Sequence, residues 1–441
     1  MKKILSLISM ILILLLAACG GGNSDISDEN ADTDGDETGG TELSFIAYSN
    51  YEAPLEAVIE DFEAENPNIT VKLELAPFEQ LMETIEIKMG SKSEDVDLLF
   101  VDSPLAVNYA LKGYLEPLDS LMSPDIADAW VDSAVDGVTF QDQMIAAPMN
   151  SSSQVLYLNK DIFEEKGVPL PKENERLTWE EIIEIAEQLT YDSNGDGQND
   201  VFGFSFDQID RAYQLLALSD SLDAEMVSEN GLEATGYTNS PEAVEAFQFY
   251  SDLFNKYGVS PRIDRAESID YFISGKIAMY LGANHNLPKL EESDLNYGVS
   301  LHPYFAKGEV ATPTGAWNVG ISKYSKNKEA AAKFLAYLTT GEGAKTVFEI
   351  GGTLPVANEL LDFIETDPMY DEFPNNIIRI SATESRETAV PRPKTPGYLE
   401  WETNMNGAFK NIKNGTDPQE ALNQAASEID NLLKKYEEAV E

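Results

Sequence analysis

Aromatic and polar side chains follow several predicted strands, and together they could bind a ligand with apolar faces and a polar rim. Asn50 and Tyr51 follow a first alternating segment, and Asp102 with Ser103 follows a third. Loops at strand ends carry the binding groups of α/β sheets. An aromatic plane suits the C–H face of a sugar, and amide, carboxylate or guanidinium groups bind its hydroxyls. These four residues are therefore candidate ligand contacts.

Trp317 is the aromatic residue that fits this role best. Gly315 and Ala316 precede it, and no apolar run surrounds it. Packing in the core is the alternative interpretation. Arg392 could donate a fork of hydrogen bonds to hydroxyls or to a carboxylate, and a surface ion pair is its alternative. Further stacking candidates are Tyr51, Tyr280 and Trp401.

The segment 192–200 resembles a calcium-binding loop. Oxygen-bearing side chains occupy alternate positions, with a glycine at the sixth position for a sharp turn: Asp192, Asn194, Asp196, Gln198 and Asp200. Gly203 stands at the twelfth position, where an EF-hand has a bidentate Glu, so another segment would have to complete the shell. The alternative is a turn stabilised by Asp and Asn side chains without metal. Calcium would be structural here, and no other cofactor is required.

Catalytic motifs are sparse. The chain has two histidines, His285 and His302, and no HExxH, GxSxG, GxGxxG or P-loop sequence. Carboxylate pairs for glycoside hydrolysis are recognised by their separation in space, which a sequence does not give. The sequence therefore favours a binding protein over an enzyme.

Residues 1–18 predict a secretory signal peptide. Lys2 and Lys3 precede an apolar run from Ile4 to Leu16, which is short for a membrane-spanning helix. Ala17-Ala18-Cys19 then resembles the bacterial lipobox, in which the cysteine receives a diacylglycerol; a plain signal peptide is the alternative. Cys19 is the only cysteine, which excludes an intramolecular disulfide. We expect a lipid-anchored protein on the extracellular face of the cell membrane.

Composition bounds the rest of the chain. Residues 19–41 are rich in Gly, Ser, Asn, Thr and acid and predict a disordered acidic tether that starts at the lipidated cysteine. The length of 441 residues allows two domains, and the 43% apolar content is ordinary for a globular protein. The formal net charge of −48 excludes a nucleic-acid partner.

Periodicity after residue 42 predicts an α/β fold. Apolar residues alternate over 43–47 and 69–75 and are continuous over most of 96–101, as in strands, while 55–62 has helical spacing. Strands that alternate with helices imply a sheet with crossover helices. Further helices are predicted after the capping residue Thr178, from Pro241, over 328–339 and from Pro418.

The order of six segments resembles the maltose-binding-protein family of extracellular solute-binding proteins. In chain order the segments are Leu43–Val71, which contains Phe62–Pro67, then Val96–Leu99, Gly113–Asp119, Leu156–Asp161, Phe272–Met279, and Tyr297–Val299 continuing through Gly315 to Ile321 and into Asn327–Ala331. The tail 390–398 is most similar to the sugar-binding members. The resemblance implies a periplasmic-binding-protein-like α/β fold with two lobes, joined by hinge crossings, and a ligand cleft between them.

The same resemblance implies which segments form each lobe. The first lobe would comprise 42–153 and 279–321, and the second 154–278 and 322–441. The crossings would lie near Ser153–Tyr157, Ala278–Tyr280 and Ile321–Tyr324. Polar residues beside these crossings join the candidate ligand contacts: Asn150, Ser151 and Asn284.

The function implied is a monomeric substrate-binding lipoprotein that captures a sugar or oligosaccharide and delivers it to an ABC permease. Three alternatives remain. The ligand could be another small solute, such as a compatible solute or a polyamine. The protein could instead be a secreted carbohydrate-active enzyme, or an adhesin that exposes a large apolar patch.

Cys19→Ala tests the anchor. The variant should move from the membrane fraction to the medium or accumulate as an uncleaved precursor, because it lacks the thiol that receives the lipid. Cell fractionation with immunoblotting distinguishes these fates. Mature variant protein that stays on the membrane would contradict the lipobox interpretation.

Overall fold

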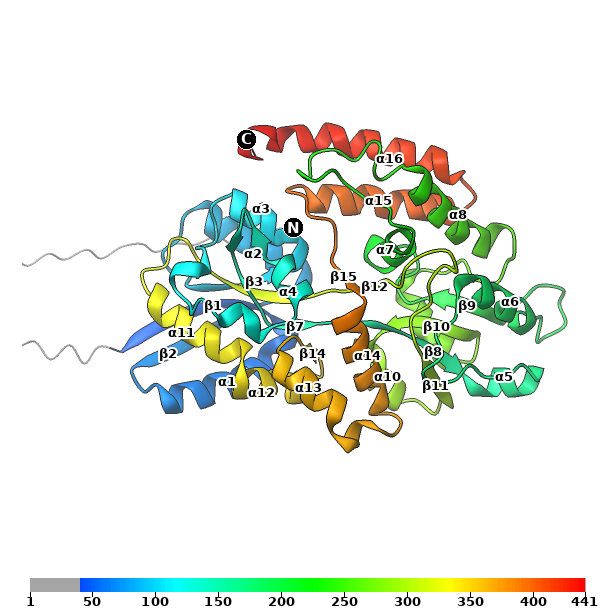
Figure 1. Ribbon diagram of the computed structural model, residues 1–441, viewed down its shortest axis with the longest axis horizontal. Helices are drawn as coiled ribbons and strands as arrows, with labels where there is room; N and C mark the ends of the chain where they lie inside the picture. Colours follow the sequence, from blue (N-terminus) through cyan, green and yellow to red (C-terminus); the bar gives the residue numbers. More distant parts are fainter. Residues whose placement is uncertain (1–39, 441) are drawn as a thin grey trace, which may run out of the picture. The chain divides into compact units, whose positions relative to one another are not determined.

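Two β-sheets organise the computed structural model, which describes residues 40–440 (Figure 1). The first has five strands in the order β2-β1-β3-β13-β6, and the second has four in the order β11-β8-β10-β9. The predicted signal peptide, Cys19 and nearly all of the tether lie outside the described residues. Within 40–440 no helix has the length and apolar character needed to cross a membrane.

The first sheet contains the strands predicted near the start of the chain. Its members are β1 (Thr41–Tyr48), β2 (Ile69–Ala76), β3 (Leu98–Asp102), β6 (Ala147–Pro148) and β13 (Trp317–Ile321). β1 runs parallel to β2 and β3, and β13 runs antiparallel to β3 and β6. The helices that accompany it are α1 (Glu52–Glu65), α2 (Phe78–Gly90), α3 (Ala106–Leu111), α4 (Asp132–Gly137), α11 (Lys328–Thr339) and α12 (Gly341–Gly351). We call this sheet and these helices the first lobe.

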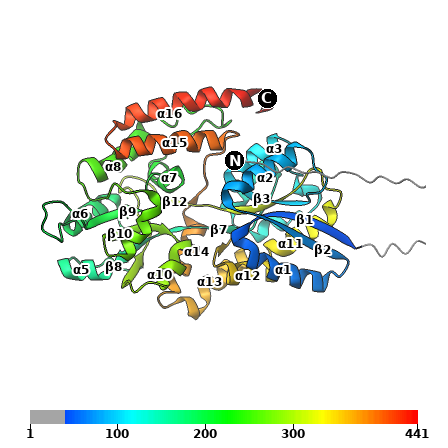
Figure 2. The ribbon, with the colours of Figure 1, turned by 180° about the vertical axis from the view of Figure 1, so that it is seen from behind.

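The second sheet contains strands from the middle of the chain. Its members are β8 (Gln154–Asn159), β9 (Phe202–Phe206), β10 (Ile277–Ala283) and β11 (Tyr297–Ser300). The principal helices around it are α5 (Lys160–Lys166), α6 (Trp179–Leu189), α7 (Ala212–Ser221), α8 (Pro241–Asn255), α14 (Asn376–Glu387), α15 (Tyr398–Lys413) and α16 (Pro418–Leu433). α15 packs against α7, α8 and α16, as Figure 2 shows from behind. We call this group the second lobe.

Local capping explains where the predicted helices begin. The Thr178 hydroxyl accepts a hydrogen bond from the Glu181 N–H, and the Glu181 carboxylate accepts one from the Thr178 N–H. These two hydrogen bonds form the predicted capping box. Ser240 and Asp417 cap α8 and α16, each with a proline at the start of the helix. The helix predicted over 328–339 is confirmed as α11.

The sheet pairing corrects the lobe assignment implied by the family resemblance. Residues 279–300 belong to the second lobe, because β10 pairs with β8 and β9, and β11 pairs with β8. Helices α11 and α12, over 328–351, pack with α1 of the first lobe. The chain passes between the lobes over 149–153, over 301–316, and between the end of α12 and the start of α14.

Two of the expected crossings are therefore wrong. Ala278–Tyr280 lies inside β10, and Ile321–Tyr324 follows β13 on the way to α11 of the same lobe. The crossing expected near Ser153–Tyr157 adjoins the observed passage over 149–153. These crossings were carried over from the family resemblance. Periodicity could not correct them, because it reports which face of a strand is buried and not which sheet the strand joins.

Tyr280 and Trp401 lie in the core, which corrects their assignment as ligand-stacking residues. Both side chains are fully buried. The Tyr280 ring stacks on Phe272 with centroids 5.0 Å apart, and its hydroxyl donates to Asp207 Oδ1 at 2.5 Å. Trp401 lies on the buried face of α15, 5.8 Å from the ring of Tyr398. An aromatic residue on a buried helix face is core by default.

Trp401→Ala should lower the free energy of unfolding by about 3–5 kcal/mol, because it leaves a large cavity in the core. Urea unfolding followed by circular dichroism measures the loss. Leu399→Ala is the matched control on the same helix, since that side chain is 50% exposed. A Trp401→Ala protein as stable as the control would contradict the core position.

Candidate functional site

A pocket of about 580 Å³ opens between the lobes, and residues of both lobes line it. The volume is within the range of small-molecule sites. Most of the predicted contacts line this cleft pocket: Asn50, Tyr51, Asp102, Asn150, Ser151, Asn284, Trp317 and Arg392. The residues selected by their positions at strand ends and by the family resemblance are distant in sequence, and most of them line the same pocket.

The first lobe supplies an aromatic wall. Trp317, half-buried at the start of β13, lies 5.6 Å from Tyr48 and 6.1 Å from Phe78, measured between ring centroids. Its other neighbour is Phe100, in the core at 5.4 Å. Tyr48 ends β1 and Phe78 begins α2, so strand ends and a helix start build one wall. This wall can pack against the apolar face of a ligand.

Asn150 braces that wall. Its amide nitrogen donates to Tyr51 Oη at 2.6 Å and to Thr353 Oγ1 at 3.2 Å. Its amide oxygen accepts the backbone N–H of Trp317 at 3.0 Å. Only 3% of Asn150 is exposed. The amide of Asn150 therefore makes hydrogen bonds to Tyr51 and Trp317, and its observed role is to position these two residues.

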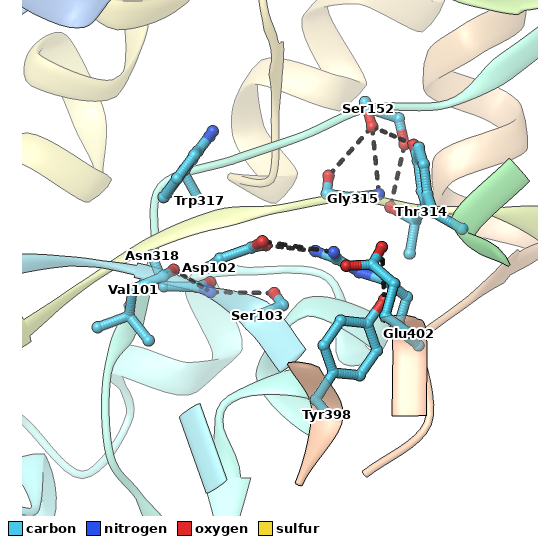
Figure 3. A network of polar contacts seen from close by, with 12 residues as sticks. Val101, Asp102, Ser103, Ser152, Thr314, Gly315, Trp317, Asn318, Tyr398 and Glu402 are labelled. Carbon is cyan, nitrogen blue, oxygen red and sulfur yellow. Dashed lines mark hydrogen bonds and ion pairs between the residues drawn. The ribbon is translucent and has the colours of Figure 1, made fainter. Parts of the chain in front are cut away.

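A cluster of polar groups joins the passage over 149–153 to the passage over 301–316; Figure 3 shows the contacts of Ser152, Thr314 and Gly315. Ser152 Oγ lies 2.8 Å from Tyr213 Oη and accepts the N–H of Gly315 at 3.1 Å. Ser151 Oγ lies 2.8 Å from Thr314 Oγ1. A Cβ on Gly315 would lie 3.1 Å from Ser152 Oγ, so the close approach favours glycine. Four residues of this cluster line the cleft pocket: Ser151, Ser152, Tyr213 and Gly315.

The charged residues of the pocket are paired. Both Arg392 Nη atoms donate to the Asp102 carboxylate, one at 3.4 Å. Burial is the largest single influence and would lower the pKa of Arg392, but the charge and hydrogen bonds of Asp102, together with Tyr398 and the Glu402 charge, raise that pKa above its ordinary value. Arg211 Nε donates to Glu402 at 3.2 Å. Arg392 is thus not free for ligand: it forms an ion pair, which was the alternative interpretation, although the pair is buried rather than on the surface.

Tyrosine hydroxyls in the pocket remain donors at neutral pH. Burial raises the pKa of Tyr51 to about 12, even though hydrogen bonds from Asn150 and Thr353 oppose the shift. Burial also raises the pKa of Tyr213. Because both phenols stay protonated, each presents a neutral hydroxyl to the pocket or to its protein partners.

Ser103 does not line the cleft pocket. Its hydroxyl accepts a hydrogen bond from Asn318 Nδ2 at 3.0 Å, and it lines a smaller neighbouring cavity. Sequence reasoning missed several residues that do line the cleft pocket: Tyr48, Phe78, Ser152, Gln208, Arg211, Tyr213, His285 and Thr353. Gln208 and Arg211 follow β9, so the alternating segment 202–206 was the signal that could have found them.

The 192–200 loop forms an Asp- and Asn-stabilised turn on the surface. Asp192 accepts the N–H groups of Asn194, Gly195 and Gly197, and the hydrogen bond from Gly197 leads in lowering its pKa. Asp200 accepts from Ser193 and Asn194. Across residues 40–440, no group of three His, Cys, Asp or Glu side chains is arranged to hold a metal ion. Calcium binding by Asp192, Asn194, Asp196, Gln198 and Asp200 stays a prediction.

Comparison with known proteins places this geometry in context. A model of the bacterial extracellular solute-binding protein family matches residues 48–345. A putative binding protein from Brucella abortus is 27% identical over 408 residues, covering 90% of this chain and 94% of the relative. The maltodextrin-binding protein MdxE of Bacillus subtilis is 26% identical over 435 residues, covering 96% of each chain.

A solved structure shares the fold. It is an ABC substrate-binding protein from Listeria monocytogenes in complex with cycloalternan, and it matches with a TM-score of 0.74 at 23% sequence identity. The match covers 90% of this chain and 99% of that chain. The expected two-lobed α/β fold is thereby confirmed.

Chelation tests the 192–200 loop. The turn interpretation predicts a melting temperature that is indifferent to EDTA, because backbone N–H groups already occupy the Asp192 carboxylate. Differential scanning fluorimetry with EDTA, and then with excess calcium, measures this. A midpoint that falls with EDTA, recovers with calcium and no longer responds in Asp196→Ala would support the calcium prediction instead.

Proposed function

We propose that this protein captures a sugar or oligosaccharide in its cleft pocket and delivers it to an ABC permease. The chain belongs to the bacterial extracellular solute-binding proteins, and this membership supports the proposal. The observation that carries the proposal is the pairing of two unlike walls. The first lobe presents Tyr48, Phe78 and Trp317, and the second lobe presents polar groups such as Gln208 and Asn284. Sugars have this combination of apolar faces and polar edges.

Relatives support the choice of a sugar. The Bacillus subtilis relative is named for maltodextrin, and the Listeria monocytogenes structure contains cycloalternan. The paired charges of the pocket also favour a neutral ligand. A polyamine or a quaternary amine would favour an aromatic cage with few hydroxyl partners, whereas this pocket is rich in amides and hydroxyls.

Binding without turnover is part of the proposal. Asp102 is the one carboxylate among the described residues that line the cleft pocket. Glycoside hydrolysis ordinarily uses two carboxylates that flank the scissile bond. A single carboxylate, already paired with Arg392, supports the role of a receptor.

The anchor and the location follow from the sequence. We assign Cys19 as the lipidated residue, so that the mature, monomeric protein remains at the extracellular face of the cell membrane. The tether would then hold the folded region within reach of the permease.

Trp317→Ala tests the site. Loss of the stacking ring should weaken binding of the sugar about tenfold to a hundredfold, since stacked, desolvated rings contribute about 1–3 kcal/mol. A thermal-shift screen of mono- and oligosaccharides first identifies a ligand, and calorimetric titration then gives the affinity. The free energy of unfolding should fall by about 1–3 kcal/mol, because Trp317 also packs against Tyr48 and Phe100.

Phe363→Ala is the matched control. Phe363 is 42% exposed on α13 (Asn358–Thr366), and its ring lies 6.1 Å from that of Tyr370 in a T-shaped arrangement. Its removal should leave the affinity unchanged within twofold. Equal affinities in Trp317→Ala and wild type would remove Trp317 from the site. A screen in which only cationic solutes raise the thermal unfolding midpoint would contradict a sugar as the ligand.

A further inference from the structure

The Asp102–Arg392 ion pair connects the two lobes at the cleft pocket. Asp102 is the last residue of β3, the central strand of the first sheet. Arg392 belongs to the strap, residues 391–397, which lies between β15 (Ala389–Val390) and α15. Because α15 packs on α7 and α8, the strap ends in the second lobe.

Aromatic rings of the second lobe hold the guanidinium. Its central carbon lies 5.5 Å from the ring centroid of Tyr213 on α7 and 5.5 Å from that of Tyr398 on α15. Between these rings the Arg392 side chain is 5% exposed, whereas the Asp102 side chain is 15% exposed. The carboxylate is therefore the more exposed member of the pair; Figure 3 shows the contacts that join Asp102 to its partner.

The carboxylate has acceptor capacity to spare. Two oxygens offer about four lone-pair sites, and Arg392 uses two of them. Asp102 stands opposite Trp317 in the β3–β13 register. A sugar ring packed on the indole would thus have a carboxylate acceptor beside it.

Two further contacts attach the strap to the first lobe outside the cleft pocket. Lys394 Nζ lies 2.6 Å from Asp136 Oδ1 on α4, with 41% of the lysine side chain exposed. Asn108 Nδ2 on α3 donates to Pro396 O at 2.5 Å. The strap therefore carries one buried and one exposed ion pair to the same lobe, which provides an internal comparison.

We propose that Arg392 is a positioning residue that acts through Asp102. It orients the Asp102 carboxylate as the ligand-facing acceptor and holds the lobes together across the cleft pocket, while its own guanidinium stays between Tyr213 and Tyr398. In its ligand-binding part this inference rests on the proposed function.

A double-mutant cycle on the sugar found with wild-type protein tests the positioning role. Asp102→Asn and Arg392→Met should each weaken binding about tenfold or more. The double variant should be no weaker than the worse single variant by more than about twofold, because both changes remove the same acceptor. Arg392→Lys should recover part of the loss, since it keeps the charge but loses the two-pronged geometry.

Lys394→Met is the control, because it removes the other ion pair of the strap. It should change the affinity by less than twofold. An equal loss in Lys394→Met, or losses that multiply in the double variant, would overturn the positioning role. If Arg392→Met fails to fold by circular dichroism, Arg392→Lys takes its place in the cycle.

Small-angle X-ray scattering of ligand-free protein separates this inference from the proposed function. Arg392→Met should have a larger radius of gyration than wild type, and Lys394→Met should not. An unchanged radius in Arg392→Met would overturn the link between the lobes. Failure of every sugar to bind wild-type protein would refute the proposed function and leave this measurement decisive for the inference.

Discussion

The need to satisfy polar groups where the chain passes between the lobes determines much of the site. The passage over 149–153 is buried, with Asn150 and Ser153 almost inaccessible to solvent. Two of its backbone N–H groups donate to residues outside the passage. Ser152 N–H donates to Gly315 O, in the passage over 301–316, at 2.8 Å, and Ser153 N–H donates to Asn284 Oδ1, in the second lobe, at 3.1 Å. An unpaired group here would cost about 1–3 kcal/mol. Of these residues, four also line the cleft pocket: Asn150, Ser152, Asn284 and Gly315.

The same requirement limits what the sequence could reveal. Alternation located β1 and β2, and a continuous apolar run located β3. The rule that ligands bind at strand ends then selected Asn50, Tyr51 and Asp102 correctly as pocket residues. It did not say that β10 lies between β8 and β9, because partner choice is decided by contacts distant in sequence. Tyr48 and Phe78 were missed for a related reason. Each is an ordinary apolar residue at the end of an element, and only their approach to Trp317 makes them a wall.

Trp317 shows that core packing and a position on the pocket wall need not be alternatives. The ring contacts Phe100 in the core and Tyr48 at the pocket, and it remains half-buried. The neighbouring rings restrict its rotamer, so little side-chain entropy remains to be lost when a ligand packs on it. The backbone hydrogen bond from Trp317 to Asn150 restrains it further. The two roles were alternatives in the sequence analysis, because a sequence does not show that one part of a side chain is buried while another part lines a pocket.

Charge pairing reconciles the pocket with the rest of the chain. The protein carries a formal charge of −48, and a field of that sign repels anions and attracts cations without selectivity. At physiological salt the Debye length is about 8 Å, so distant surface carboxylates contribute little inside the cleft pocket. Within it, Asp102 faces Arg392 and Arg211 faces Glu402. A neutral sugar neither gains nor loses from the outer field, so its affinity depends on stacking and hydrogen bonds at short range. An acidic exterior is therefore compatible with selective capture of an uncharged ligand.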